Sequence, residues 1–375
     1  MSDKVVGILG GSLVQVMPFP SHRFFARGRP TRSYARSSSF LLNIKTVILD
    51  VGEAGPAKQV LAPTAPQFSH IDGSFTDPAR IRELAAKVDI LTVEIEHVDA
   101  DALADIQCET QPSPGTIKLI QDKLAQKSHL QSRGCPISDF MPIDSTIESI
   151  CAAAKDLGLP LMLKSRTLAY DGRGNFVLRE LSQAEEALTA LGDRPLYAEK
   201  WVPFTHEIAV MVDNVCHLVF APLRSRDATL SKRAQHVAEH AVTTFDGAGV
   251  FGVEMFLMTD GGLFINEIAP RPHNSGHYTI EACETSQYEN HLRAILSLPL
   301  GSTALKVPAA AMLNIIGLSS SMTEINTLVA VALTVSGASV HLYGKYDCRK
   351  GRKMGHITVV AESDAQLRSR LRVLL

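Results

Sequence analysis

Apolar runs separated by glycine and polar turns predict an α/β fold at the start of the chain. Residues 4–11 form an apolar run that ends in two glycines, a pattern typical of the buried parallel strand that opens a nucleotide-handling domain. Further strands are predicted at 43–50 and 90–97, with a helix between them at 78–88. A serine cap and a proline then open a helix predicted at 113–133. We therefore expect an N-terminal domain built on a parallel sheet.

The segment between the first two predicted strands breaks this pattern. Residues 12–41 contain three prolines and five arginines but no acidic residue. Proline at this density cannot continue a helix, and the composition is typical of a disordered region. An arginine-rich, acid-poor N-terminal region can also be a transit peptide, but the strand predicted ahead of it argues against that alternative.

A glycine-rich loop follows a short strand predicted at 161–166, which carries Lys164 near its end. Glycines in this loop, residues 167–175, can turn backbone N–H groups toward an anion, and Arg173 adds positive charge. The loop is therefore a candidate flap over phosphates. A plain hairpin loop is the alternative for a single glycine-rich turn.

A strand predicted at 197–203 leaves into a proline, and a strand edge of this kind can pair its backbone groups with an adenine ring. Glu199 on this strand and Glu207 at the start of the next are candidates for nucleotide binding. Ordinary surface charge is the alternative for both glutamates.

Two apolar runs within residues 251–268 flank an Asp-Gly-Gly turn at 260–262, a strong signal for a β-hairpin. If the Asp-Gly pair is a two-residue loop, Glu254 lies directly opposite Glu267. Two carboxylates this close repel each other in a half-buried sheet unless a proton or a cation lies between them. With Asn266 as a further oxygen ligand, the pair suits Mg²⁺ or Mn²⁺ shared with nucleotide phosphates. A different turn register, which would point one glutamate to solvent, is the alternative.

Polar groups gather in the loop that leaves the second strand of this hairpin. Arg271, His273 and Asn274 follow one another closely there, and two prolines stiffen the loop. Stiff polar loops that leave a buried strand often carry catalytic groups.

A second group of cations lies near the end of the chain. Lys345, Arg352 and Lys353 belong to a basic stretch around a glycine between two predicted strands. Such a cluster suits a phosphate-bearing substrate. A solvated basic turn is the alternative.

Composition narrows the class of protein. The chain has 375 residues, 45% hydrophobic and 20% charged, which is enough for two or three globular domains. Its net charge of −2 gives no field that would attract a polyanion, so nucleic acid is not an expected partner. No apolar run is long enough to span a membrane, so no membrane association is expected. The six scattered cysteines lack C-x-x-C spacing, which argues against a zinc site or a disulfide framework and indicates a reducing compartment.

Taken in order, the motifs resemble those of the ATP-grasp superfamily and, within it, N5-carboxyaminoimidazole ribonucleotide synthases, including the ATPase part of fungal phosphoribosylaminoimidazole carboxylases. The resemblance covers most of residues 43–361 and rests on residues 91–97, 164–174, 251–256, 266–279, 343–345 and 352–356. It implies an α/β protein with a parallel-sheet N-terminal domain like that of biotin carboxylase (1–112), an ATP-grasp domain (113–304) with a flap subdomain at about 136–205, and a small C-terminal α+β domain (305–375).

The resemblance also implies an activity: ATP-driven carboxylation of 5-aminoimidazole ribonucleotide by bicarbonate through carboxyphosphate, in purine (IMP) biosynthesis, by a cytoplasmic homodimer. The implied nucleotide contacts are Lys123, Lys164, Ala169, Gly172, Arg173, Gly174, Glu199, Lys200, Val202, Glu207 and Asn266. The implied ligands of Mg²⁺ or Mn²⁺ are Glu254 and Glu267. The implied catalytic residues are Tyr170, Asp171, Arg271, His273 and Lys353, and the implied substrate contacts are Glu94, Asn274, Lys345 and Arg352.

This sequence departs from the family pattern. Only Gly10 and Gly11 remain of the glycine turn and first helix that help bind the ribonucleotide, and a small insertion lies around residues 62–69. A hairpin with a nucleotide-contacting histidine is absent after Val212. The resemblance also implies that the fungal proteins continue into a mutase-like domain, whereas this sequence stops at Leu375. Because loss of the first helix should uncover one face of the N-terminal sheet and remove part of the substrate site, we predict impaired stability and weak or absent carboxylation. The alternatives are another ATP-grasp ligase, against which the C-terminal basic cluster argues, and a non-catalytic nucleotide-binding subunit.

Overall fold

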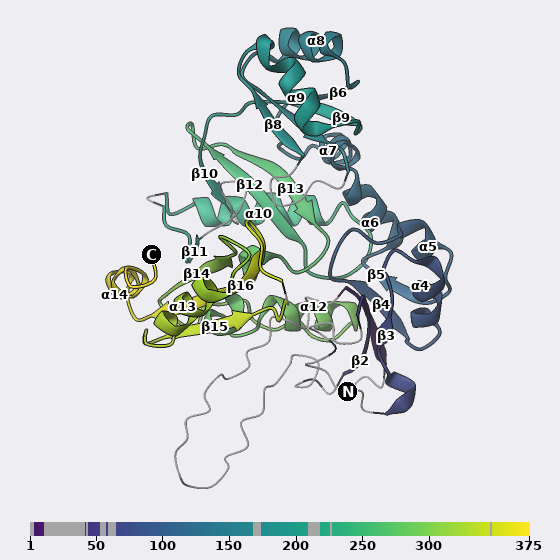
Figure 1. Ribbon diagram of the computed structural model, residues 1–375, viewed down its shortest axis with the longest axis vertical. Helices are drawn as coiled ribbons and strands as arrows, with labels where there is room; N and C mark the ends of the chain where they lie inside the picture. The colour runs from purple at the N-terminus through teal and green to yellow at the C-terminus, as the bar shows by residue number, and fades with distance from the viewer. Residues whose placement is uncertain are drawn as a thin grey trace.

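The computed structural model describes residues 4–10, 42, 44–52, 58, 65–167, 174–208, 218–225, 227–345 and 347–375. Within these residues the chain forms four β-sheets with helices packed around them, from the purple and blue N-terminal sheet to the yellow-green C-terminal sheet in Figure 1. This arrangement is the α/β fold that the sequence predicts. In the same part of the chain, no helix is both long enough and apolar enough to cross a membrane.

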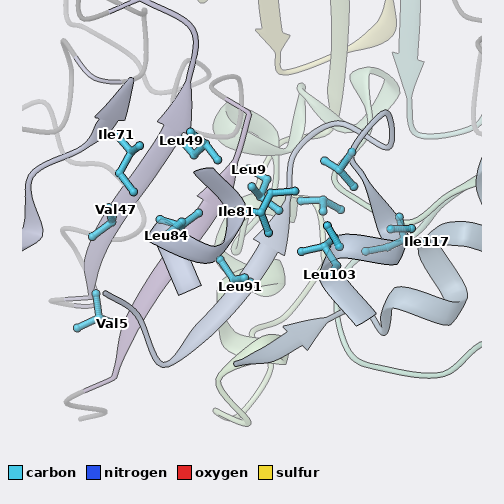
Figure 2. Close-up of a cluster of buried hydrophobic side chains, with 14 residues drawn as sticks. Val5, Leu9, Val47, Leu49, Ile71, Ile81, Leu84, Leu91, Leu103 and Ile117 are labelled. Atoms are coloured by element: carbon cyan, nitrogen blue, oxygen red, sulfur yellow. The ribbon is translucent and has the colours of Figure 1, made fainter. Parts of the chain in front are cut away.

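The N-terminal sheet is entirely parallel, in the order β3-β2-β1-β4-β5. Its strands are β1 (Val5–Leu9), β2 (Lys45–Asp50), β3 (Ile71–Asp72), β4 (Ile90–Val93) and β5 (Glu109–Gln111). One face packs against α4 (Pro78–Ala85) and α5 (Ala100–Ala104), and Figure 2 shows the apolar side chains that fill this layer.

The opposite face of this sheet packs against α12 (Gln287–Ile295) and Tyr343, which come from much later in the chain. Both faces of β1 are therefore buried, and even Val5 at its start is only 8% exposed. The expectation that loss of the first helix uncovers a face of the sheet is wrong for β1, because α4 covers one side and α12 covers the other.

The helix predicted at 113–133 is in fact two helices, α6 (Pro114–Gln121) and α7 (Lys123–Ser132). Ser113 caps α6 as predicted, since its side chain accepts a hydrogen bond from the backbone N–H of Thr116. The prediction missed the break at Asp122, which has extended backbone angles (φ −98°, ψ 106°) and whose carboxylate caps α7. The break makes Lys123 the first residue of a separate helix.

Three further sheets complete the fold. The flap sheet, at the top of Figure 1, has the order β6-β9-β7-β8 and is covered by α8 (Ile147–Leu157) and α9 (Ala184–Leu191). Its strands are β6 (Phe140–Ile143), β7 (Leu161–Ser165), β8 (Asn175–Leu178) and β9 (Leu196–Lys200). The central sheet contains β10 (Phe204–Ile208), β12 (Gly252–Met258) and β13 (Leu263–Ala269), and packs on α7 and α10 (Leu230–Val242).

The C-terminal sheet has the order β11-β14-β16-β15 and packs on α13 (Thr323–Ala332) and α14 (Asp364–Leu371). Its strands are β11 (Leu218–Ala221), β14 (Ala309–Ile316), β15 (Ala338–Leu342) and β16 (Lys353–Ala361). β11 falls within the sequence range predicted for the ATP-grasp domain, yet it pairs with β14 of the last sheet. The short elements are η1 (Pro66–Phe68), η2 (Leu181–Gln183), η3 (Asn274–Gly276) and α11 (Thr279–Ala282).

Candidate active site

The hairpin of β12 and β13 places Glu254 directly opposite Glu267, as the sequence predicts. The predicted two-residue turn is wrong, however. Met258 donates a hydrogen bond to the carbonyl of Gly262, which leaves a three-residue loop. Gly261 in that loop has a φ of +84°, a conformation that glycine adopts without strain.

A β-bulge restores the pairing of Glu254 with Glu267, which the three-residue loop would otherwise shift by one residue. Between the Glu254–Glu267 pair and the Met255–Ile265 pair, β13 contains one extra residue, Asn266. Ile265 is buried in the core beneath the sheet, whereas Asn266 and Glu267 both reach the polar cluster on its other face. The bulge therefore turns two consecutive polar side chains toward the same site.

Two lysines of α7 pair with glutamates of two different sheets, and a third lysine comes from β7. Lys123 and Lys127 lie one turn apart on α7, and Lys123 pairs with Glu267. Lys127 pairs with Glu199 of the flap sheet at 2.7 Å, and Lys164 pairs with the other oxygen of that carboxylate at 2.6 Å. Helix α7 thus links the flap sheet to the central sheet.

Glu199 is a buried structural anion, only 3% exposed, so the surface-charge alternative is wrong for it. Burial by itself would raise its pKa, but the charges of Lys127 and Lys164 outweigh that effect and lower the pKa to about 2. Ser138 donates a further hydrogen bond to the carboxylate. The sequence did not indicate a role for Lys127, although its spacing of four residues from Lys123 on one helix was the available signal.

Three glutamates around the hairpin, Glu254, Glu267 and Glu207, influence one another's ionisation. Burial, followed by repulsion from Glu267 and Glu207, raises the pKa of Glu254 well above its ordinary value. Burial and then Glu267 raise the pKa of Glu207 to about 7. Burial opposes ionisation of Glu267 as well, but Lys123 lowers its pKa. A carboxylate cluster that resists full ionisation is an environment that a divalent cation would stabilise.

The donor set fits Mg²⁺ or Mn²⁺ in its chemistry, because carboxylate and amide oxygens are the ligands these hard ions take. Asn266 lies within the cluster: its Oδ1 accepts from Lys164 and its Nδ2 donates to Glu207, both at 3.3 Å. In the described part of the chain, no three His, Cys, Asp or Glu side chains are grouped so that they could hold a metal ion by themselves. A metal held by Glu254 and Glu267 would therefore need ligands from elsewhere, such as phosphate oxygens.

Arg271 joins the N-terminal sheet to this cluster. Its guanidinium pairs with Glu96, in the segment just after β4, through Nη2–Oε1 at 3.1 Å and a second bond from Nε to Oε2. Burial would raise the pKa of Glu96, but Arg271 lowers it to about 2. A cavity beside the pair is lined by the segment after β4, the end of α6, α7, β13 and the loop that follows β13. Its lining includes Glu96, His97, Gln121, Lys123, Glu267, Arg271 and His273.

His273 lies next to Glu254, with Nε2 of the ring 3.5 Å from Oε1 of the carboxylate. Its Nδ1 is 2.9 Å from the hydroxyl of Ser275. Burial, followed by the charge of Arg271, lowers the pKa of His273 to about 4, so the imidazole is neutral at physiological pH. No sequence pattern indicated the residue that holds its backbone, Gln287 of α12.

Of the remaining residues predicted to be catalytic or to bind substrate, some lie near Glu254 and His273 and others lie apart from them. Lys353 lies near enough to influence the pKa values of Glu254 and His273, and Lys345 donates to the Lys353 carbonyl at 2.9 Å. Arg352 is instead tied to Asp347 in a surface turn. Glu94 adds to the electrostatic environment of Arg271. Asn274 begins the short helix η3 after His273.

Most of the glycine-rich loop predicted to cover the phosphates lies outside the part of the chain that the structure describes. Ala169, Tyr170, Asp171, Gly172 and Arg173 lie outside the described residues. The strands that flank them, β7 and β8, form an antiparallel pair closed by a hydrogen bond from Ser165 N to Gly174 O of 2.7 Å. That geometry is compatible with both a flap and a plain hairpin loop.

The side chain of Lys200 does not join the cluster, because Lys200 is half exposed and pairs with Asp139 at 3.2 Å. Successive side chains of β9 point to opposite faces of the sheet. Because Glu199 is buried on one face, the side chain of Lys200 points outward on the other. Val202 next to it accepts a hydrogen bond from Phe204 N at 2.9 Å through its carbonyl.

Comparison with known proteins agrees with this architecture. Three family profiles match in order: the ribonucleotide synthetase preATP-grasp domain at residues 31–121, the ATP-grasp domain at 128–213 and 212–288, and the phosphoribosylaminoimidazole carboxylase C-terminal domain at 310–370. The fold and the site together define an ATP-grasp enzyme.

The relatives narrow the class. Phosphoribosylaminoimidazole carboxylase of Ogataea methanolica is 48% identical over 99% of this chain and 69% of its own length. N5-carboxyaminoimidazole ribonucleotide synthase of Synechococcus elongatus is 40% identical over 76% of each chain. The solved structure of carboxyaminoimidazole ribonucleotide synthase from Aspergillus clavatus with ATP is 40% identical, covers 99% of this chain and 97% of its own, and has a TM-score of 0.88. The chain therefore belongs to the N5-carboxyaminoimidazole ribonucleotide synthase family, which includes the corresponding part of fungal phosphoribosylaminoimidazole carboxylases.

Proposed function

We propose that this chain carboxylates 5-aminoimidazole ribonucleotide with bicarbonate at the expense of ATP, forming the N5-carbamate, ADP and phosphate in purine biosynthesis. The observation that carries the proposal is the opposed pair Glu254–Glu267, bordered by Lys123 on one side and by His273 on the other. A related structure from Aspergillus clavatus, 38% identical with a TM-score of 0.87, holds ADP and 5-aminoimidazole ribonucleotide and supports the choice of substrates.

The nucleotide half of the site uses charge and positioning. Lys123 and Lys164 would bind the ATP phosphates, Glu207 and the backbone of residues 199–202 would bind the nucleoside, and Glu254, Glu267 and Asn266 would hold Mg²⁺ or Mn²⁺. When bound, the metal ion would neutralise part of the charge on the phosphates. Lys123, now paired with Glu267, would exchange that partner for a phosphate. Phosphoryl transfer depends on such positioning and charge stabilisation more than on a nucleophilic side chain.

The acceptor half would lie beside Arg271, His273 and Lys353. A bicarbonate oxygen attacks the γ-phosphorus and ADP leaves, which gives carboxyphosphate. The exocyclic amine of the ribonucleotide then attacks the carboxyl carbon, phosphate leaves, and the amine loses one proton. The buried cation Arg271 would hold the bicarbonate, and the neutral imidazole of His273 is available to accept a proton. Asp171 and Tyr170 of the loop, together with Glu94, Asn274, Lys345 and Arg352, would bind the ribonucleotide.

The proposal is tested by ADP release from the purified chain with ATP, Mg²⁺ and bicarbonate, in the presence and absence of 5-aminoimidazole ribonucleotide. We expect release that depends on the ribonucleotide and that Glu267→Gln abolishes. Because this sequence lacks parts of the family's substrate site, we also expect weaker turnover than in a full-pattern relative. Tight ATP binding with no ribonucleotide-dependent release would contradict the proposed reaction and favour a non-catalytic nucleotide-binding subunit.

We also propose a homodimer in the cytoplasm, on the basis of the family resemblance and of cysteines that form no disulfide pattern. Light scattering of the purified chain tests the dimer, because a mass of one chain across the accessible concentration range would contradict it. Imaging of a tagged chain in cells tests the compartment.

A further inference from the structure

Gln287, the first residue of α12, makes two hydrogen bonds with the backbone of His273. The N–H of His273 donates to Gln287 Oε1 at 2.9 Å, and Gln287 Nε2 donates to the carbonyl of His273 at 2.8 Å. His273 has extended backbone angles (φ −117°, ψ 151°), so the side-chain amide takes the place of a neighbouring strand. Gln287 thereby holds both backbone groups of His273 from outside its loop, and within the loop the His273 carbonyl also accepts a hydrogen bond from Gly276 N at 2.9 Å.

Two glycines leave room for this contact. A Cβ at position 276 would lie 2.3 Å from Gln287 Oε1, and a Cβ at position 252 would lie 2.6 Å from the Cβ of His273. Gly276 therefore admits the amide, and Gly252 lets His273 approach strand β12 closely. His273 is held between α12 and β12, with little freedom to move toward either.

Helix α12 is a rigid support for the amide. Its residues Tyr288, Leu292 and Ile295 are buried against Ile48 and Ile90 of the N-terminal parallel sheet. The backbone of His273 is thus tied to a helix packed on the core, in addition to the proline-containing loop that carries it. A loop alone would hold a catalytic group less accurately than a packed helix does.

We propose that Gln287 is a positioning residue that holds the imidazole of His273 beside Glu254 by fixing the backbone of His273. The catalytic consequence rests on the proposed function, in which His273 works next to the reacting groups. The effect of Gln287 on the position of the His273 ring does not depend on whether the chain turns over substrate.

The same helix offers a matched control. Asn290 makes the same kind of double contact with Gly301: its Oδ1 accepts from the Gly301 N–H at 2.8 Å and its Nδ2 donates to the Gly301 carbonyl at 3.2 Å. Gln287→Met and Asn290→Leu each remove one such contact and keep the side-chain length. Only the first of these contacts involves a residue of the candidate active site.

The decisive measurement is the nitrogen–proton correlation spectrum of the histidine rings, with the His273 signals assigned by their loss in His273→Gln. Gln287→Met should shift the His273 ring signals, and Asn290→Leu should leave them in place. In the ADP-release assay, Gln287→Met should lower kcat by roughly 100-fold, the scale expected for a small misplacement of a catalytic group, while KM for ATP changes by less than about twofold. Gln287→Glu, which keeps the acceptor but loses the donor, should fall between Gln287→Met and the wild type.

Unchanged His273 ring signals in Gln287→Met would overturn the proposal, as would an equal loss of kcat in Asn290→Leu. If the wild-type chain shows no ribonucleotide-dependent ADP release, the proposed function fails and the ring signals alone decide the positioning role. A shift confined to Gln287→Met and Gln287→Glu then supports it, and no shift rejects it.

Discussion

Lys127 and Glu199 form an ion pair of 2.7 Å in which the side chains are only 2% and 3% exposed. Lys127 comes from α7 and Glu199 from β9, so the pair joins the helix that begins with Lys123 to the flap sheet. Removal of one partner from a buried pair is costly because the other charge stays in a medium of low polarity.

Lys127→Met should therefore destabilise the protein by about 3 kcal/mol, the low end of the range for a broken buried pair because Lys164 still pairs with Glu199, measured as a lower midpoint of urea unfolding. The control is Lys118→Met, which removes an ion pair of similar length, 2.6 Å to Asp101, whose side chains are 63% and 76% exposed. That change should cost less than about 1 kcal/mol, because solvent screens exposed pairs. Similar losses in the two variants would show that burial does not set the strength of the Lys127 pair.

Glu254→Gln should stabilise the nucleotide-free protein at neutral pH while it abolishes turnover. Burial, then Glu267 and Glu207, raise the pKa of Glu254, so the folded state resists the ionisation that the unfolded chain undergoes freely. The wild type therefore loses stability as pH rises from the ordinary pKa of 4.5 toward the raised pKa, by about 1.4 kcal/mol per pH unit, and glutamine avoids that loss.

Thermal unfolding at pH 7 and at pH 4 checks this expectation, since the two proteins should converge at the lower pH. Addition of Mg²⁺ and ATP should raise the midpoint of the wild type and leave that of Glu254→Gln unchanged. A variant that is less stable than the wild type at pH 7, or that is stabilised equally by the nucleotide, would contradict the assignment of Glu254.

His291 should make the protein lose stability in weak acid. It is completely buried, hydrogen-bonded to Thr92 at 2.8 Å and to the N–H of Val250 at 3.1 Å, and burial lowers its pKa from 6.5 to about 4. The unfolded chain binds a proton at a higher pH than the folded one, so stability is lost as pH falls from about 6.5 to about 4, by roughly 3 kcal/mol in total.

In His291→Gln, the slope of unfolding free energy against pH should be shallower in this window. The control is His236→Gln, at an exposed position on α10, which should keep the wild-type slope. If the unfolding free energy of His291→Gln depends on pH with the same slope as that of the wild type, His291 is not the cause of the acid loss of stability.

Gly252→Ala should lower turnover by roughly 100-fold, because a Cβ there would lie 2.6 Å from the Cβ of His273 and displace the imidazole. Gly261→Ala is the matched control in the same hairpin. It meets no atom within 4 Å but has a φ of +84°, so it should cost about 1–2 kcal/mol of stability and leave kcat unchanged. Comparison of kcat with the thermal midpoint separates the two effects, and full activity in Gly252→Ala would show that His273 can move without loss.

The hairpin shows how far sequence patterns reach. The Asp-Gly turn and the flanking apolar runs predicted two antiparallel strands with Glu254 opposite Glu267, and that pairing is present. It arises differently from the prediction, through a three-residue loop and a bulge at Asn266 that compensates for it. The bulge has no local signal, since it forms where β13 must present two polar side chains to one face and still bury Ile265 and Ile268.

The parallel N-terminal sheet, the cap at Ser113, the acidic hairpin and the ATP-grasp family could all be predicted from the sequence alone. These features depend on residues close together in the chain: alternation of apolar and polar positions, turn chemistry and short motifs. Three other features became evident only in the folded chain: Glu199 is buried between Lys127 and Lys164, Glu96 holds Arg271, and α12 fixes His273. The physical reason is that the energy of a charge or an amide depends on burial and on its partners, and here those partners come from helices and strands far away in sequence.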